Sequence, residues 1–163
     1  QRDAPWERVI HDRGYRGAVL GPFEAWLLLR GMRTLFLRVS HSAMSAQRIA
    51  EWLTNHSAVS EVFYPGLPTH PGHAIAARQM SGGFGMLLSF RLRGGAAAAT
   101  HVAGRLRLFK NATSLGGVES LVEHRAPVEG PGTRVPDDLL RLSVGIEMVE
   151  DLQADLEQAL ERE

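Results

Sequence analysis

The hydrophobic spacing of the chain changes from helical to strand-like near residue 58, and this change constrains the fold more than any other feature. Before it, apolar residues recur at helical spacing over 21–37 and 42–55. After it, short apolar runs with strand-forming residues predict strands. The predicted strands lie at 59–64, 85–92, 106–112, 120–126 and 139–145.

Helices are expected between and after these strands, at 72–80, 96–106 and 147–161. After the leading helices, the order of elements is therefore β-α-β-α-β-β-β-α. We expect an α/β (α+β) sandwich, in which helices cover one face of a small, mostly antiparallel sheet.

The composition fits one domain and excludes several classes of protein. A length of 163 residues corresponds to about one domain or to two very small ones. The chain has no cysteine, so a disulfide framework and a thiolate zinc site are excluded. The apolar stretch 25–29 is far shorter than the roughly 20 residues that a membrane span needs, so we expect no membrane partner. The chain does not begin with Met, and we expect it to begin within a longer protein.

Eighteen basic residues balance eighteen acidic ones, but the two signs are unevenly placed. Residues 1–118 carry 14 basic and 6 acidic side chains, whereas residues 119–163 carry 4 and 12. We expect the two halves to pack together with complementary fields. No Lys or Arg residues are adjacent in the sequence, so nucleic-acid binding is not expected.

Arg141 is the first candidate functional residue, because it lies inside the predicted strand 139–145. A guanidinium flanked by leucines is costly to bury unless it is paired, and its forked donors match a carboxylate. Two interpretations stay open. Arg141 binds the carboxylate of a ligand, or it pairs at a sheet edge with an acid such as Glu119 or Glu147.

Ser114 is the second candidate, because it begins the segment SLGG between two predicted strands. Glycines at such a place indicate close approach of the backbone to another group. The Ser114 hydroxyl and neighbouring N–H groups suit an anion such as a carboxylate. The alternative is a bulge or bend in the sheet.

Three other groups favour ordinary structural interpretations. His70 and His73 could ligate a metal only with a further ligand, and we interpret them as polar residues at a helix start. The glycine-rich loop 81–85 follows a helix and precedes a strand, the reverse of a phosphate-binding loop. Lys110, the only lysine, could form a Schiff base only if desolvated, and the alternation of 107–111 points it to solvent.

Four motifs in a fixed order connect these features. They are GPFEAWLLLRGMRTLFLR, VFYPGLPTHPGH, SLGGVESLVEHRA and LLRLSVGIEMVEDLQADLEQAL. Together they closely resemble the C-terminal part of the pyridoxal-phosphate (PLP)-dependent Cys/Met-metabolism enzymes. That family includes cystathionine γ-synthase, cystathionine γ- and β-lyases, methionine γ-lyase and O-acetylhomoserine sulfhydrylase. The resemblance runs from about Pro5 to Leu160.

The resemblance implies a fold-type-I arrangement, with residues 1–57 as a helical connecting segment and 58–163 as the small C-terminal domain. The large domain, which carries the Schiff-base lysine and binds PLP, would be absent from this chain. The resemblance also implies that Arg141 grips the substrate α-carboxylate and that Ser114 assists. It implies no catalytic, cofactor-binding or metal-binding residue here.

Two departures from the family pattern affect the expected substrate. Many members follow the SLGG segment with Pro-Ala and Met-Thr-His, whereas residues 123–131 read EHRAPVEGP. Position 113 is Thr, where some lyases carry Glu. Both differences would change how the substrate side chain is selected.

We therefore expect part of a cytoplasmic trans-sulfuration enzyme, a carbon–sulfur lyase or γ-replacement enzyme for cystathionine or homoserine-type amino acids. The chain would be a fragment or a truncated gene product, inactive alone and without bound PLP. Its expected partners are the missing PLP domain, a sulfur amino acid and further copies in a homo-oligomer. The alternative is a non-catalytic, self-associating interaction module.

Overall fold

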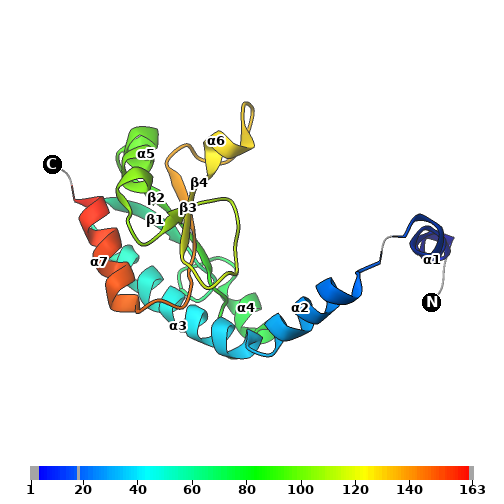
Figure 1. Cartoon of the computed structure of the whole chain (residues 1–163). Helices are drawn as coiled ribbons and strands as arrows, with labels where there is room; N and C mark the ends of the chain where they lie inside the picture. Colours follow the sequence, from blue (N-terminus) through cyan, green and yellow to red (C-terminus); the bar gives the residue numbers. More distant parts are fainter. Residues whose placement is uncertain (1–3, 18, 162–163) are drawn as a thin grey trace. The chain divides into compact units, whose positions relative to one another are not determined.

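The structure is a computed structural model that describes residues 4–17 and 19–161 (Figure 1). Its packing divides the chain into one unit up to Phe36 and a second from Leu37 onward. The first unit holds α1 (Ala4–Arg16) and α2 (Pro22–Met32), and neither of these described helices has a buried residue. The functional division at residue 58 stays a prediction.

The helix that follows, α3 (Leu35–Thr54), begins earlier than the sequence pattern predicted. We expected helices over 21–37 and 42–55, but the break lies near Thr34. There the Thr34 hydroxyl donates to the Gly31 carbonyl (3.4 Å). Glycine is a weak helix former, and a local hydroxyl bond competes with the helical ladder. The predicted boundary was therefore wrong.

A five-stranded sheet organises the second unit, with the strand order β1-β2-β5-β4-β3. The strands are β1 (Val59–Phe63), β2 (Leu87–Leu92), β3 (Lys110–Asn111), β4 (Leu121–His124) and β5 (Leu139–Ser143). All neighbours are antiparallel except β3 and β4. The mostly antiparallel sheet is thus confirmed, and β5 lies at its centre.

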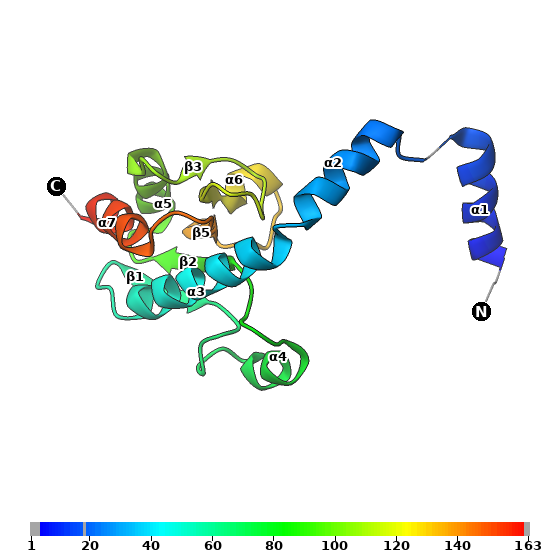
Figure 2. The same ribbon diagram turned by 60° about the horizontal axis from the view of Figure 1, so that its bottom comes forward.

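Helices α3, α5 and α7 pack their apolar residues against one face of this sheet. The helices not yet bounded are α4 (His73–Gln79), α5 (Gly95–Arg105), α6 (Arg125–Glu129) and α7 (Val149–Leu160). Both views show α3 and α7 side by side (Figures 1 and 2), where Arg48 binds Glu150 at 2.8 Å. Figure 2 shows α4 outside these layers.

The core lies between those three helices and the inward face of the strands. Its large members are Ile49, Leu53, Leu88, Phe90, Leu140, Leu142, Leu152 and Leu156. Each such side chain contributes roughly 1.5–3 kcal/mol when it is fully buried. This arrangement confirms the predicted fold class, a sheet with helices on one face.

The strand predicted over 106–112 is reduced to Lys110–Asn111. Asp155 of α7 provides the reason, since its carboxylate accepts the backbone N–H groups of residues 107–109 at 2.8–3.2 Å. Amides that bind this side chain do not join a neighbouring strand. The prediction of a longer strand was wrong.

The strand predicted over 120–126 ends at His124, and α6 begins at the next residue. Pro127 explains this change, because proline has no N–H to donate to a strand ladder and is tolerated in the first turn of a helix. As a result, Arg125 lies at the junction of β4 and α6.

Among the described residues, the structure contains no helix with the length and apolarity required to cross a membrane.

Candidate functional site

Strand β5 presents two different faces because its side chains alternate. Leu140 and Leu142 are fully buried in the core. Arg141 and Ser143 therefore lie on the face away from the covering helices. In the strand register, Arg141 lies opposite Ser89 of β2 and Glu123 of β4. A cation thus lies at the centre of the open face, and not at the sheet edge.

The guanidinium of Arg141 is anchored through one nitrogen. Its Nη2 lies 2.7 Å from Glu123 Oε2 and donates to the carbonyls of Thr113 (2.8 Å) and Ser114 (3.4 Å). Among the described residues, the hydrogen bonds of this group all run through Nη2. The side chain is 20% exposed. Nη1 and Nε are therefore the donors left for a ligand.

Glu123 is a buried carboxylate that two guanidinium groups share. Its side chain is only 2% exposed, and Arg125 Nη1 donates to both of its oxygens at 3.1 and 3.2 Å. Arg125 also binds Glu129 through Nη2. The hydrogen bond to Glu123 raises the pKa of Arg125 despite partial desolvation. Burial of Glu123 is tolerated because the carboxylate is paired and hydrogen-bonded.

The segment 113–116 lies against the open face of β5. Arg141 holds its carbonyls, and the Gly116 N–H donates to the Ser143 hydroxyl (3.0 Å). Gly116 has a φ of +75°, which favours glycine at this turn. Ser114 is exposed. The strand thus places the Ser114 backbone beside Arg141.

A second set of hydrogen bonds fixes the end of β5. The Gly145 N–H donates to the Ser120 hydroxyl (2.8 Å), and Ser42 Oγ donates to the Gly145 carbonyl (2.7 Å). Glu147 accepts both the N–H and the hydroxyl of Ser120 at 2.7 and 2.8 Å. A Cβ at Gly145 would lie 2.2 Å from the Val118 carbonyl oxygen. Only glycine therefore fits against the backbone of residues 118–119.

The histidine pair has structural contacts. The ring of His73 lies 2.7 Å from the Pro65 carbonyl, and the His70 ring accepts the Gly72 N–H (3.1 Å). The described residues hold no group of three or more potential ligands that could bind a metal ion.

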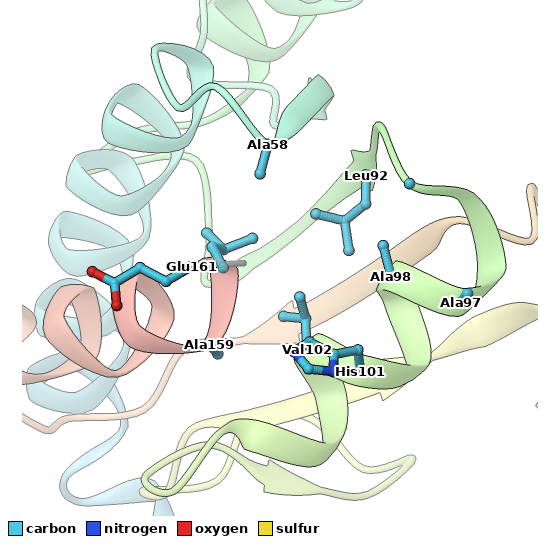
Figure 3. Close-up of a pocket in the computed structure, with 10 residues that line it drawn as sticks. Ala58, Leu92, Ala97, Ala98, His101, Val102, Ala159 and Glu161 are labelled. Carbon is cyan, nitrogen blue, oxygen red and sulfur yellow. The ribbon is translucent and has the colours of Figure 1, made fainter. Parts of the chain in front are cut away.

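A hollow of about 410 Å³ lies on the helix-covered side, between the end of β2, α5 and α7 (Figure 3). Small and apolar residues such as Ala98, Val102 and Ala159 form much of its wall. The Glu161 carboxylate points away from it in Figure 3. Within this described lining, polar groups do not converge to orient a substrate, so the hollow is not the candidate site.

Comparison with known proteins decides the family. The model of the family described as "Cys/Met metabolism PLP-dependent enzyme" matches residues 5–161. The chain belongs to this family. The resemblance carried by the four motifs is thereby confirmed.

Similar proteins include enzymes with different reactions. Cystathionine gamma-synthase of Mycobacterium tuberculosis (strain ATCC 25618 / H37Rv) is 54% identical over 149 residues, which cover 88% of this chain and 38% of that protein. L-methionine gamma-lyase of Fusobacterium nucleatum subsp. polymorphum is 43% identical over 163 residues, or 95% of this chain and 41% of that protein. The chain spans about two-fifths of the length of these relatives.

A solved structure agrees with the sequence comparison. Cystathionine gamma synthase from Xanthomonas oryzae pv. oryzae, in complex with cystathionine, is 45% identical to this chain and has a TM-score of 0.88. The match covers 98% of this chain and 43% of that structure's chain.

The residues of this chain do not fit a covalent anchor for PLP, the cofactor of the family. Such an anchor needs a lysine amine in a desolvated pocket. Lys110, the only lysine in the sequence, is exposed on β3, and its amine donates to the Arg107 carbonyl (3.4 Å). The prediction that Lys110 faces solvent is confirmed.

The main residues that the sequence analysis missed are Glu123 and Arg125. The acids considered as partners of Arg141 were Glu119 and Glu147, but the partner is Glu123. Strand alternation could have indicated it, because Glu123 lies on the opposite face of β4 from the buried Val122. The register that places Glu123 opposite Arg141 depends on long-range pairing.

Proposed function

We propose that this chain is the substrate-carboxylate-binding C-terminal domain of a PLP-dependent trans-sulfuration enzyme. The enzyme is a carbon–sulfur lyase or a γ-replacement enzyme that acts on cystathionine or homoserine-type amino acids. Residues 1–57 form its connecting segment, and residues 58–163 form the binding domain. Kinship with metabolic enzymes supports a cytoplasmic location.

The observation that carries the proposal is that Arg141 forms its hydrogen bonds to the described residues through Nη2, which leaves the other donors unbonded. Nη1 and Nε each keep N–H donors that can reach an oxygen of an α-carboxylate, and such charge-assisted hydrogen bonds are stronger than neutral ones. Ser114 assists from the adjoining segment through its hydroxyl or N–H. Gripping the carboxylate fixes the orientation of the bonds to the substrate Cα.

The proposed enzyme needs a second polypeptide segment to hold PLP. The first unit offers a surface for it, because α2 exposes large apolar side chains. These are Phe23, Trp26, Leu27, Leu28, Leu29 and Met32. Exposed apolar surface of this kind marks an interaction site. Either the PLP domain or further copies in a homo-oligomer cover it.

The direct test uses the purified 163-residue chain. We expect no release of ammonia or thiol from cystathionine after addition of PLP, because the only lysine is exposed and held at β3. Robust turnover by the chain alone would contradict the proposal that another polypeptide segment holds PLP.

The exposed residues of α2 also favour a second candidate, a non-catalytic module that associates with itself. Sedimentation separates the two. A stable, specific dimer at low micromolar concentration supports the module. A monomer that aggregates supports a domain whose partner is missing.

A further inference from the structure

The buried Glu123 presents a problem for a carboxylate site built on Arg141. Its carboxylate lies 2.7 Å from the guanidinium and is nearly inaccessible to solvent. If Arg141 were its only cation, the two charges would form a closed ion pair. A substrate carboxylate would then have to compete with a buried carboxylate already in place.

Arg125 weakens the competition of Glu123 for Arg141, because it binds both oxygens of the same carboxylate. Its Nη1 donates a hydrogen bond to each oxygen of Glu123, whereas Arg141 approaches this carboxylate as an ion pair, with Nη2 2.7 Å from Oε2. Arg125 is fixed in turn by Glu129, one turn further along α6. Its side chain is 30% exposed, so this group also lies partly within the protein.

The three less exposed charges of the site leave one cation unbalanced. Arg125, Arg141 and Glu123 together carry a net charge of +1, and Glu129 at the rim is more exposed (38%) and is screened by water. A bound carboxylate would bring the partly buried group to neutrality. Two cations around one buried anion therefore favour a second anion next to Arg141.

We propose that Arg125 is a positioning residue for the carboxylate clamp. It holds Glu123 through two hydrogen bonds and neutralises part of its negative charge. Arg141 therefore keeps Nη1, Nε and its positive field for the substrate. The proposal rests on the function proposed above for Arg141. It also assigns a role to the unusual EHRAPVEGP segment, which contains both Arg125 and Glu129.

The test measures L-methionine binding to the full 163-residue chain. The signal is the Nε–Hε resonance of Arg141 in ¹⁵N spectra, assigned with R141K. We expect R125Q to weaken L-methionine binding about tenfold, because Glu123 then holds Arg141 alone. R134Q changes an exposed arginine in the connection after α6, and it should leave binding unchanged.

Two rescue variants separate positioning from a merely structural role. R125Q/E123Q removes the competing charge, and its affinity should return to within about threefold of the wild type. R125K keeps the cation and should restore most of the affinity. Thermal unfolding of each variant confirms that the compared chains are folded.

A measurement without ligand keeps this inference separate from the proposed function. In ligand-free R125Q, the Arg141 Nε–Hε resonance should shift, because Glu123 then has only the Arg141 guanidinium as its partner. If the wild type does not bind L-methionine but this shift occurs, the proposed carboxylate binding by Arg141 is contradicted, whereas the positioning role of Arg125 is supported. The inference is overturned if the resonance does not shift, if R125Q binds L-methionine like the wild type, or if R125Q/E123Q stays weak.

Discussion

The two faces of strand β5 are built from neighbouring residues, yet they serve opposite purposes. Leu140 and Leu142 are completely buried beneath the helices. Arg141 and Ser143, which alternate with them, hold the segment 113–116 through polar contacts. The period of two in a strand thus lets one short sequence supply stability on one side and the proposed ligand contacts on the other.

The largest effect should come from the helix-covered face. L142A removes a fully buried side chain, and we expect the free energy of unfolding to fall by about 4 kcal/mol because a cavity remains in the core. Urea unfolding measures this change. L115A, at an exposed leucine of the opposite segment, should change stability by less than about 0.5 kcal/mol.

On the open face, the largest effect on stability should come from Glu123. E123A leaves Arg125 and Arg141 without their buried partner, and we expect a loss of about 3 kcal/mol in unfolding free energy. E123Q keeps an oxygen that can accept hydrogen bonds and should lose less. Equal stabilities for E123A and the wild type would contradict the assigned role of this carboxylate.

The helix-covered face also contributes a pH dependence through Tyr64. Burial, with a smaller effect of Glu51, raises the pKa of Tyr64 from about 10 to about 12. Between these values the unfolded chain has lost the phenol proton and the folded chain still holds it. Stability should therefore fall by about 2 kcal/mol as the pH rises from 10 to 12.

Y64F isolates this contribution. The variant loses the hydrogen bond from the phenol to the Gly85 carbonyl (2.9 Å), so it should be less stable at neutral pH. Its unfolding free energy should decline less steeply between pH 10 and 12 than that of the wild type. Parallel curves would show that Tyr64 does not titrate as expected.

The smallest effect should follow deletion of residues 1–34. Neither α1 nor α2 has a buried residue, and both faces of β5 are formed by residues from Leu37 onward. We expect the unfolding free energy of the remaining chain to change by less than about 0.5 kcal/mol. A large loss would mean that the first unit supports the sheet.

The sequence predicted the helix-covered face better than the open one. Alternation of Leu140 and Leu142 and the apolar stripe of 147–161 are local patterns, and both gave correct elements. The shortening of β3 was not predictable in this way, because it depends on Asp155, which lies far along the chain from the amides it binds. Local spacing carries no information on such a contact.

In the candidate site, too, local patterns were predictable from the sequence and long-range contacts were not. Arg141 stood out because a guanidinium between leucines is unusual in a strand. Its partner Glu123 depends on the register of β4 and β5, and the contribution of Arg125 depends on the helix that Pro127 allows after His124. The pairing of β4 with β5 joins residues that are distant in sequence, and the end of β4 at His124 was not predicted, so the site could be suspected but not assembled from sequence.

The most direct test of the proposed function is a chimaera in which residues 5–161 replace the matching segment of the M. tuberculosis cystathionine gamma-synthase. We expect a folded, PLP-loaded chimaera that turns over the substrate of that enzyme. R141K should lower its kcat/KM about 100-fold or more, because lysine cannot reproduce the planar set of guanidinium donors, and R134K should leave it unchanged. An inactive but folded and PLP-loaded chimaera, or an R141K variant with undiminished kcat/KM, would contradict the assignment of Arg141 as the carboxylate clamp.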